Sequence, residues 1–211
     1  MFRHSQSTES IQIKDHPYQM THVSSKSRTG DILLAGTYSR LFLIDQRTNQ
    51  PRLYRIFDES VEGVVQLQMP EIERIKKMAS GVDHIVMLTE DGKVYTFGTG
   101  SRGELGTGGV VSEQEPVEVE LPDDVTVQDL AVGNWHTVAL TDSNDVYVWG
   151  WNRDGQLGEV EDKCVYTPFP LDIDDVIAVD AKECTTVLTT RDELGQVVRI
   201  TYGRLVCEEQ D

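Results

Sequence analysis

The chain has 211 residues, 38% hydrophobic and 26% charged residues and a formal net charge of −17, which is the composition of a globular protein. Residues 1–56 hold eight Lys or Arg against four Asp or Glu, so the negative charge belongs to the remainder. An acidic main body argues against direct DNA or RNA binding, and no apolar run reaches the roughly 20 residues that a membrane helix needs.

The N-terminal stretch, residues 1–17, is expected to be a disordered polar tail. Its start, MFRHSQSTES, lacks the apolar region of a secretory signal. The three cysteines, Cys164, Cys184 and Cys207, form no C-x-x-C pair, so we expect free thiols in a reducing compartment. Nucleus or cytoplasm is the predicted location.

A repeat occupies the middle of the chain. Residues 75–106 and 127–158 align without a gap at an offset of 52 and are identical at 12 of 32 positions. The shared glycines and histidines are the pairs Gly81/Gly133, His84/His136, Gly98/Gly150, Gly103/Gly155 and Gly106/Gly158. Repeats of about this length made of short strands indicate a β-propeller or a similar array.

Weaker copies flank this pair. Upstream, in residues 18–66, His22, Gly30 and Gly36 line up with His84, Gly92 and Gly98, which indicates a degenerate first repeat. Downstream, residues 176–205 resemble a further, eroded copy with Cys184 at the histidine position. Residues 67–211 are therefore predicted to hold the propeller-like repeats.

Each good copy has the composition of strands. His84–Thr89 and Lys93–Phe97 are rich in β-branched and aromatic residues and flank the turn-forming sequence at residues 90–92. The predicted fold is all-β: a partial β-propeller-type array of three to four blades, two of them well formed. An incomplete ring exposes apolar blade faces and strand edges, so we expect small-ring closure, a dimer or an open arc that needs a partner.

These residues resemble the repeat of the regulator of chromosome condensation family. The markers are the runs Ala79–His84 and Ala131–His136, then Leu-Thr, Val-Tyr-x-aromatic-Gly and Gly-x-Leu-Gly. Within the family, Gly133–His136 and Val146–Asn152 look most like the small stand-alone members. That resemblance implies a nuclear, chromatin-linked adaptor for a Jumonji-type histone-modifying oxygenase. The founding members of the family instead imply guanine-nucleotide exchange on a Ran-type small GTPase.

Residues 150–158 read GWNRDGQLG, whose first six residues have the glycine spacing of a phosphate-binding loop. Such a loop requires Lys and Ser or Thr after the second glycine, but Gly155 is followed by Gln-Leu and Gly103 by Glu-Leu. We therefore interpret these glycines as turn residues that adopt positive φ. No cofactor is predicted.

His84 and His136 recur at one position of each copy. A single active site does not need one histidine per blade, whereas a structural hydrogen bond does, so we expect each imidazole to tie a blade to its neighbour. No nucleophile elbow, metal-ligand cluster or calcium loop appears. The protein is predicted not to be an enzyme.

A partner-binding surface is sought where the two copies differ. Trp135 and Trp151 replace Asp83 and Thr99, and Asn152, Arg153 and Asp154 follow, a composition typical of binding hot spots. Packing on a neighbouring blade is the alternative for both tryptophans, whereas Trp149, which aligns with Phe97, is expected in the core.

Two acidic inter-repeat stretches, residues 113–124 and 159–175, suit either a solvated surface or the docking of a basic partner such as a histone tail. The leading hypothesis is a chromatin-associated adaptor that binds a histone-modifying oxygenase, histones or another protein. The alternatives are a nucleotide exchange factor and a truncated, non-functional propeller fragment.

Overall fold

The structure, a computed structural model, describes residues 32–37, 40–45, 50–57, 60–65 and 74–204. These residues form fifteen strands and no helix, as the sequence predicted. In this part of the chain, no helical segment meets the length and hydropathy needed to cross a bilayer. The predicted tail at residues 1–17 lies outside the described residues.

The strands make four antiparallel sheets, and in each sheet they pair in chain order. The first sheet contains β1 (Ile32–Gly36), β2 (Arg40–Asp45), β3 (Gln50–Phe57) and β4 (Ser60–Val65). The second contains β5 (Ile75–Ser80), β6 (His84–Thr89), β7 (Val94–Gly100) and β8 (Val111–Glu118). The third contains β9 (Val127–Val132), β10 (His136–Thr141), β11 (Val146–Trp151) and β12 (Cys164–Leu171). The fourth contains β13 (Val176–Lys182), β14 (Thr185–Arg191) and β15 (Val197–Gly203).

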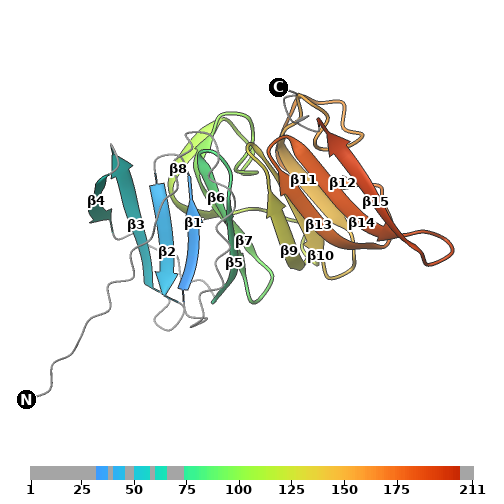
Figure 1. The fold of residues 1–211 in the computed structure, drawn as a ribbon, viewed down its shortest axis with the longest axis horizontal. Coiled ribbons are helices and arrows are strands. Elements are labelled where there is room, and N and C mark those ends of the chain that lie inside the picture. The colour runs from blue at the N-terminus through green and yellow to red at the C-terminus, as the bar shows by residue number, and fades with distance from the viewer. Residues whose placement is uncertain (1–31, 38–39, 46–49, 58–59, 66–73, 205–211) are drawn as a thin grey trace, which may run out of the picture.

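The sheets stand next to one another as blades. Their first strands form a row in which β1 contacts β5, β5 contacts β9 and β9 contacts β13. Figure 1 shows these blades as an open arc, with the first sheet at one end and the fourth at the other. The fold is thus an all-β, partial propeller, which confirms the predicted fold class.

The Leu-Thr signature fixes the hairpin between the second and third strands of a blade. The Thr89 and Thr141 hydroxyls accept the backbone N–H groups of Lys93 and Asp145, at 2.9 and 3.0 Å. The same turn needs positive φ, which Gly92 adopts at 84° and Asn144 at 69°. Two different residue types therefore make one turn, because both tolerate the left-handed region.

The apolar core lies between the blades. One cluster joins the second, third and fourth sheets, and a smaller one joins the first and second sheets, where the Phe42 and Phe97 rings meet edge to face at 5.0 Å. Trp149 is fully buried, as predicted, and its indole N–H donates to the Glu104 carbonyl of the preceding blade at 3.2 Å.

The two weak copies are in a different phase from the predicted alignment. Aligning Gly36 with Gly98 makes Ile32–Gly36 a third strand, but β1 is the first strand of its sheet and packs beside β5. In the fourth sheet, Thr185 pairs with Gly203 as His136 pairs with Gly150. Thr185, and not Cys184, therefore occupies the histidine position, and Cys184 corresponds to Trp135.

Candidate protein-interaction site

The Gly-x-x-His motif is a local contact between the glycine and the imidazole. A Cβ added at Gly133 would lie 2.1 Å from His136 Cε1, and at Gly81 it would lie 2.2 Å from His84 Cε1. The glycine N–H also donates to the backbone carbonyl of the same histidine at 2.9 Å in both copies. The glycine therefore leaves the space in which the ring lies against the backbone.

His136 ties its blade to the next one. Its Nε2 lies 2.9 Å from the Thr186 hydroxyl, which in turn donates to the Gln156 carbonyl at 2.7 Å. Because the hydroxyl proton goes to that carbonyl, Nε2–H donates to Thr186. The interblade bond predicted for this histidine is therefore present.

His84 is buried in the equivalent place but makes no such bond. Within the described residues, both of its ring nitrogens and the hydroxyl of Thr137, the repeat counterpart of Thr186, lack hydrogen-bond partners. Burial lowers the pKa of His84 to about 4. The pKa of His136 falls to about 3, first through burial and then through His84, while the Thr185 backbone raises it. Both side chains are thus neutral structural groups at pH 7.

The glycine loop serves the backbone. φ is positive at the six shared positions that run from Gly98 to Gly106 and from Gly150 to Gly158. At Gly150 a Cβ would also lie 2.4 Å from the Trp135 carbonyl oxygen. In place of phosphate ligands, the buried Glu104 carboxylate accepts the Arg102 N–H at 2.6 Å, and the Gln156 amide oxygen accepts the Asp154 N–H at 2.9 Å. This agrees with the backbone interpretation of the motif.

Trp135 and Trp151 meet on the surface at the ends of β9 and β11. Their rings stand edge to face with centroids 5.1 Å apart, and the Trp151 N–H donates to the Trp135 carbonyl at 2.8 Å. Both side chains are half-buried. They are thus brought together, as candidate surface residues must be, and they also pack on each other.

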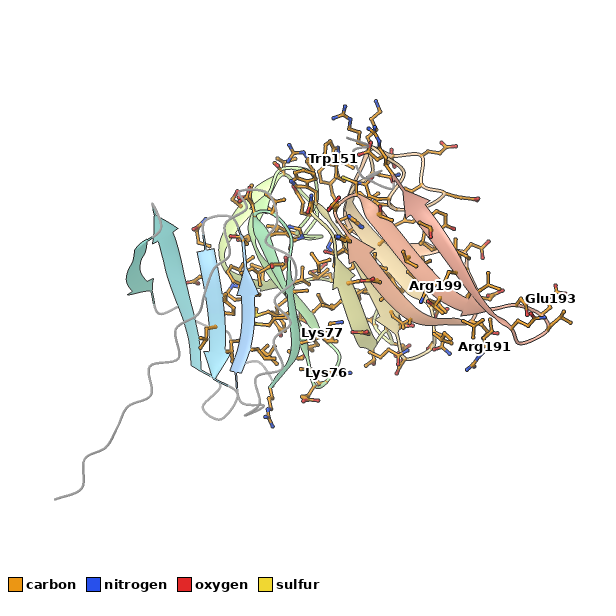
Figure 2. All side chains as sticks on the ribbon, in the orientation of Figure 1. Lys76, Lys77, Trp151, Arg191, Glu193 and Arg199 are labelled. Carbon is orange, nitrogen blue, oxygen red and sulfur yellow. The ribbon has the colours of Figure 1, made fainter. Side chains whose placement is uncertain are left out.

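Arg102 and Arg153 complete this group, which we call the Trp–Arg cluster. The Arg102 guanidinium carbon lies 4.8 Å from the Trp151 ring centroid and 5.5 Å from that of Trp135. The Arg153 guanidinium carbon lies 5.7 Å from the Trp151 centroid. Such distances are those of cation–π contacts. Figure 2 places Trp151 at the loop end of the arc.

Arg102 was not predicted as a site residue. It belongs to the preceding blade and is held by Glu104, whose carboxylate is 3% exposed and lies 3.7 Å from the guanidinium. Repeat alignment pairs Arg102 with Asp154, so the only sequence signal was that the two copies differ at this position. The contact itself joins residues of different blades.

Asn152 is not a surface contact residue. Its side chain is 7% exposed; Nδ2 donates to the carbonyls of Val160 and Asp162 at 2.7 and 3.1 Å, and Oδ1 accepts the Leu157 N–H at 2.9 Å. Since every polar atom of the amide is used within its own loop, Asn152 holds the loop and cannot bind a partner.

Asp154 lies at the next blade junction. Its carboxylate hydrogen-bonds the Cys184 thiol, and burial first and then this carboxylate raise the pKa of Cys184. Arg102 on Trp135 and Asp154 on Cys184 are therefore equivalent contacts in successive blades. Of the five predicted partner-binding residues, Trp135, Trp151 and Arg153 lie in the cluster and Asp154 beside it.

The acidic stretches lie on connections and outer strands. Glu118 at the end of β8 pairs with Lys93 at 3.0 Å and accepts the Tyr95 hydroxyl at 3.1 Å. In the described residues, no group of three or more His, Cys, Asp or Glu is arranged to hold a metal ion.

Comparison with known proteins agrees with this geometry. Two models of the regulator of chromosome condensation (RCC1) repeat match residues 91–140 and 143–181, and 75–104 and 127–156. The mouse RCC1 domain-containing protein 1 is 38% identical over 88 residues, which are 42% of this chain and 23% of that protein. An RCC1 repeat-containing protein of Dictyostelium discoideum is 30% identical over 174 residues, covering 72% and 36%.

Among solved structures, Prp20p of Saccharomyces cerevisiae superimposes with a TM-score of 0.62 at 19% identity, covering 81% of this chain and 44% of that one. The chain thus spans 23% and 36% of the length of the two curated relatives. Matching repeats and a shared blade architecture lead to one conclusion: the chain belongs to the regulator of chromosome condensation (RCC1) repeat family.

Proposed function

We propose that the protein is a non-enzymatic adaptor that acts at chromatin in the nucleus and binds a Jumonji-type histone-modifying oxygenase or another protein partner. The observation that carries the proposal is the Trp–Arg cluster. Two half-buried indoles and two guanidinium groups gathered from two blades have the composition of a protein-binding hot spot.

Preorganisation supports this assignment. Arg102 is fixed by Glu104 and by its own contacts with both indoles, so binding would order few additional groups. A surface that is already rigid loses less conformational entropy on association. Only Arg153, which is exposed, has its guanidinium held by a single ring contact.

The chromatin part of the proposal rests on charge and on relatives. The acidic stretches at residues 113–124 and 159–175 suit basic segments such as histone tails. The structural relative Prp20p is described as binding Gsp1p and histones.

The test uses purified protein coupled to beads and nuclear extract, with bound Jumonji-type oxygenases and histones identified by antibody and mass spectrometry. The double variant Trp151→Ala/Arg153→Ala should lose the oxygenase, whereas Asn144→Gly, in a hairpin turn that tolerates glycine, should retain it. If no oxygenase or histone binds the wild-type protein while a cytosolic partner does, the adaptor proposal is wrong.

Guanine-nucleotide exchange on a small GTPase is the second candidate, because Prp20p is described as binding Gsp1p, and a Caenorhabditis elegans GTPase regulator homolog is 36% identical over 89 residues. Faster release of a fluorescent guanine nucleotide from a Ran-type GTPase would favour it. Unchanged release, together with retained oxygenase binding, would favour the adaptor.

A further inference from the structure

The fourth sheet has one strand fewer than the other three. In the first three sheets the third strand pairs with a fourth, namely β4, β8 and β12, whereas no described strand pairs with the outer edge of β15. β8 and β12 are each eight residues long. The place that a fourth strand fills in the neighbouring blades is therefore an open strand edge here.

The open edge offers backbone hydrogen bonds at alternate residues. The Gln196 carbonyl and the Arg204 N–H both bond toward the β14 side, accepting from Asp192 and donating to Cys184. Because backbone groups alternate along a strand, the N–H and C=O groups of Val197, Arg199 and Thr201 face outward. An added strand would find three pairs of donors and acceptors.

The outer face of this sheet also differs from its counterparts. At the position of Val94 and Val146, both fully buried, stands the exposed Arg199. At that of Leu88 and Leu140 stands Thr189. The face that packs on a further blade elsewhere in the array is thus polar and basic in the fourth sheet.

Three cations lie on this face: Lys182, Arg191 and Arg199. Among the described residues they make no ion pair, although the chain has a net charge of −17. One carboxylate, that of Asp180, shares the face opposite Val187, and its Oδ1 accepts the Ala181 N–H. Figure 2 shows Arg191 and Arg199 along the fourth sheet, well apart from Trp151.

The second blade shows how such a cation is satisfied. There Lys93, next to the third strand, pairs with Glu118 of the fourth strand at 3.0 Å. The opposite face of β15 is apolar, since Ile200 and Tyr202 pack against the interblade core. A strand that fits this edge must therefore alternate acidic residues, toward Arg199, with apolar residues, toward Val198 and Ile200.

We propose that the open edge of β15 and the basic outer face of the fourth sheet bind an extended, acidic segment of a partner protein by strand addition. The backbone groups of Val197, Arg199 and Thr201 would supply the pairing. Arg199 and Arg191 would select acidic side chains. This surface is separate from the Trp–Arg cluster and does not depend on the adaptor function.

The test measures the fluorescence anisotropy of labelled eight-residue peptides titrated with the full chain. One peptide alternates Glu and Val, a second alternates Lys and Val, and a third holds the same Glu and Val residues in two blocks. The alternating Glu–Val peptide should bind at least about tenfold more tightly than either of the others, because it alone matches both faces of the edge.

Two variants separate charge from backbone pairing. Arg199→Glu should weaken binding of the Glu–Val peptide about tenfold, whereas Arg199→Gln should have a smaller effect. Thr201→Pro removes an outward N–H without removing a bond to β14 and should weaken binding similarly, whereas Thr201→Val should not. Thermal melting verifies that each variant is folded, and Trp151→Ala should bind the peptide as the wild type does.

Three results would overturn the proposal. They are equal binding of the Glu–Val and Lys–Val peptides, wild-type affinity in a folded Thr201→Pro variant, and a concentration-dependent dimer that Arg199→Glu dissociates. The last would show that the edge binds a second copy of this chain. Loss of oxygenase capture alone would leave this proposal standing.

Discussion

At the residue scale, the repeat positions are determined by short contacts, and Gly133 is the sharpest case. Gly133→Ala should lower the free energy of unfolding by about 3 kcal/mol or more, because the new Cβ would collide with the His136 ring and lie 2.8 Å from the Glu183 carbonyl oxygen. Gly155→Ala is the matched control: its Cβ would meet nothing within 4 Å, so only the positive φ of 77° opposes it, at about 1 kcal/mol. Urea denaturation measures both, and equal losses would contradict the contact.

The two buried histidines make stability depend on pH. Their pKa values in the folded chain, about 4 for His84 and about 3 for His136, lie below the ordinary 6.5. Below pH 6.5 the unfolded chain therefore takes up protons that the folded chain refuses. Their contribution to stability is complete above pH 6.5 and is lost as pH falls toward 4 and then 3.

Substitution of each histidine by leucine tests this dependence. His84→Leu should cost little at pH 7, since no hydrogen bond is lost among the described residues, and it should reduce the fall in stability between pH 7 and pH 4.5. His136→Leu should cost about 1–3 kcal/mol at pH 7, because the bond to Thr186 is lost. Urea denaturation at the two pH values decides, and an unchanged pH dependence in both variants would be the contrary result.

At the scale of elements, the β11–β12 connection is held by one side chain. Asn152→Ala should destabilise the protein by about 2–3 kcal/mol, because three hydrogen bonds to the loop are lost. It should also speed amide hydrogen exchange in residues 152–163. Arg153→Ala, exposed in the same loop, is the control and should leave exchange unchanged. Slow exchange in the Asn152→Ala loop would mean that other contacts hold it.

The same scale shows how far sequence alone predicts this fold. Residues 75–106 and 127–158 were readable because one Gly-x-x-His contact and one hairpin turn recur in both copies. The fourth sheet was misaligned by one residue because Lys182 stands at the glycine position and Thr185 at the histidine position, which removes both anchors. Asn152 was misassigned and Arg102 missed for a common reason: loop closure and contacts between blades leave no local pattern.

At the scale of the whole molecule, stacked blades carry 36 Asp or Glu against 19 Lys or Arg. The ion pairs of the described residues, such as Lys77–Asp129 with side chains 38% and 42% exposed, each contribute little. Repulsion among the excess carboxylates acts over a longer range, and salt screens it. We therefore expect the melting temperature to rise by about 3–5 °C between low salt and 0.3 M NaCl. The double variant Lys77→Gln/Asp129→Asn keeps the net charge and should show the same rise. A melting temperature that falls with salt would mean that local ion pairs outweigh the net charge.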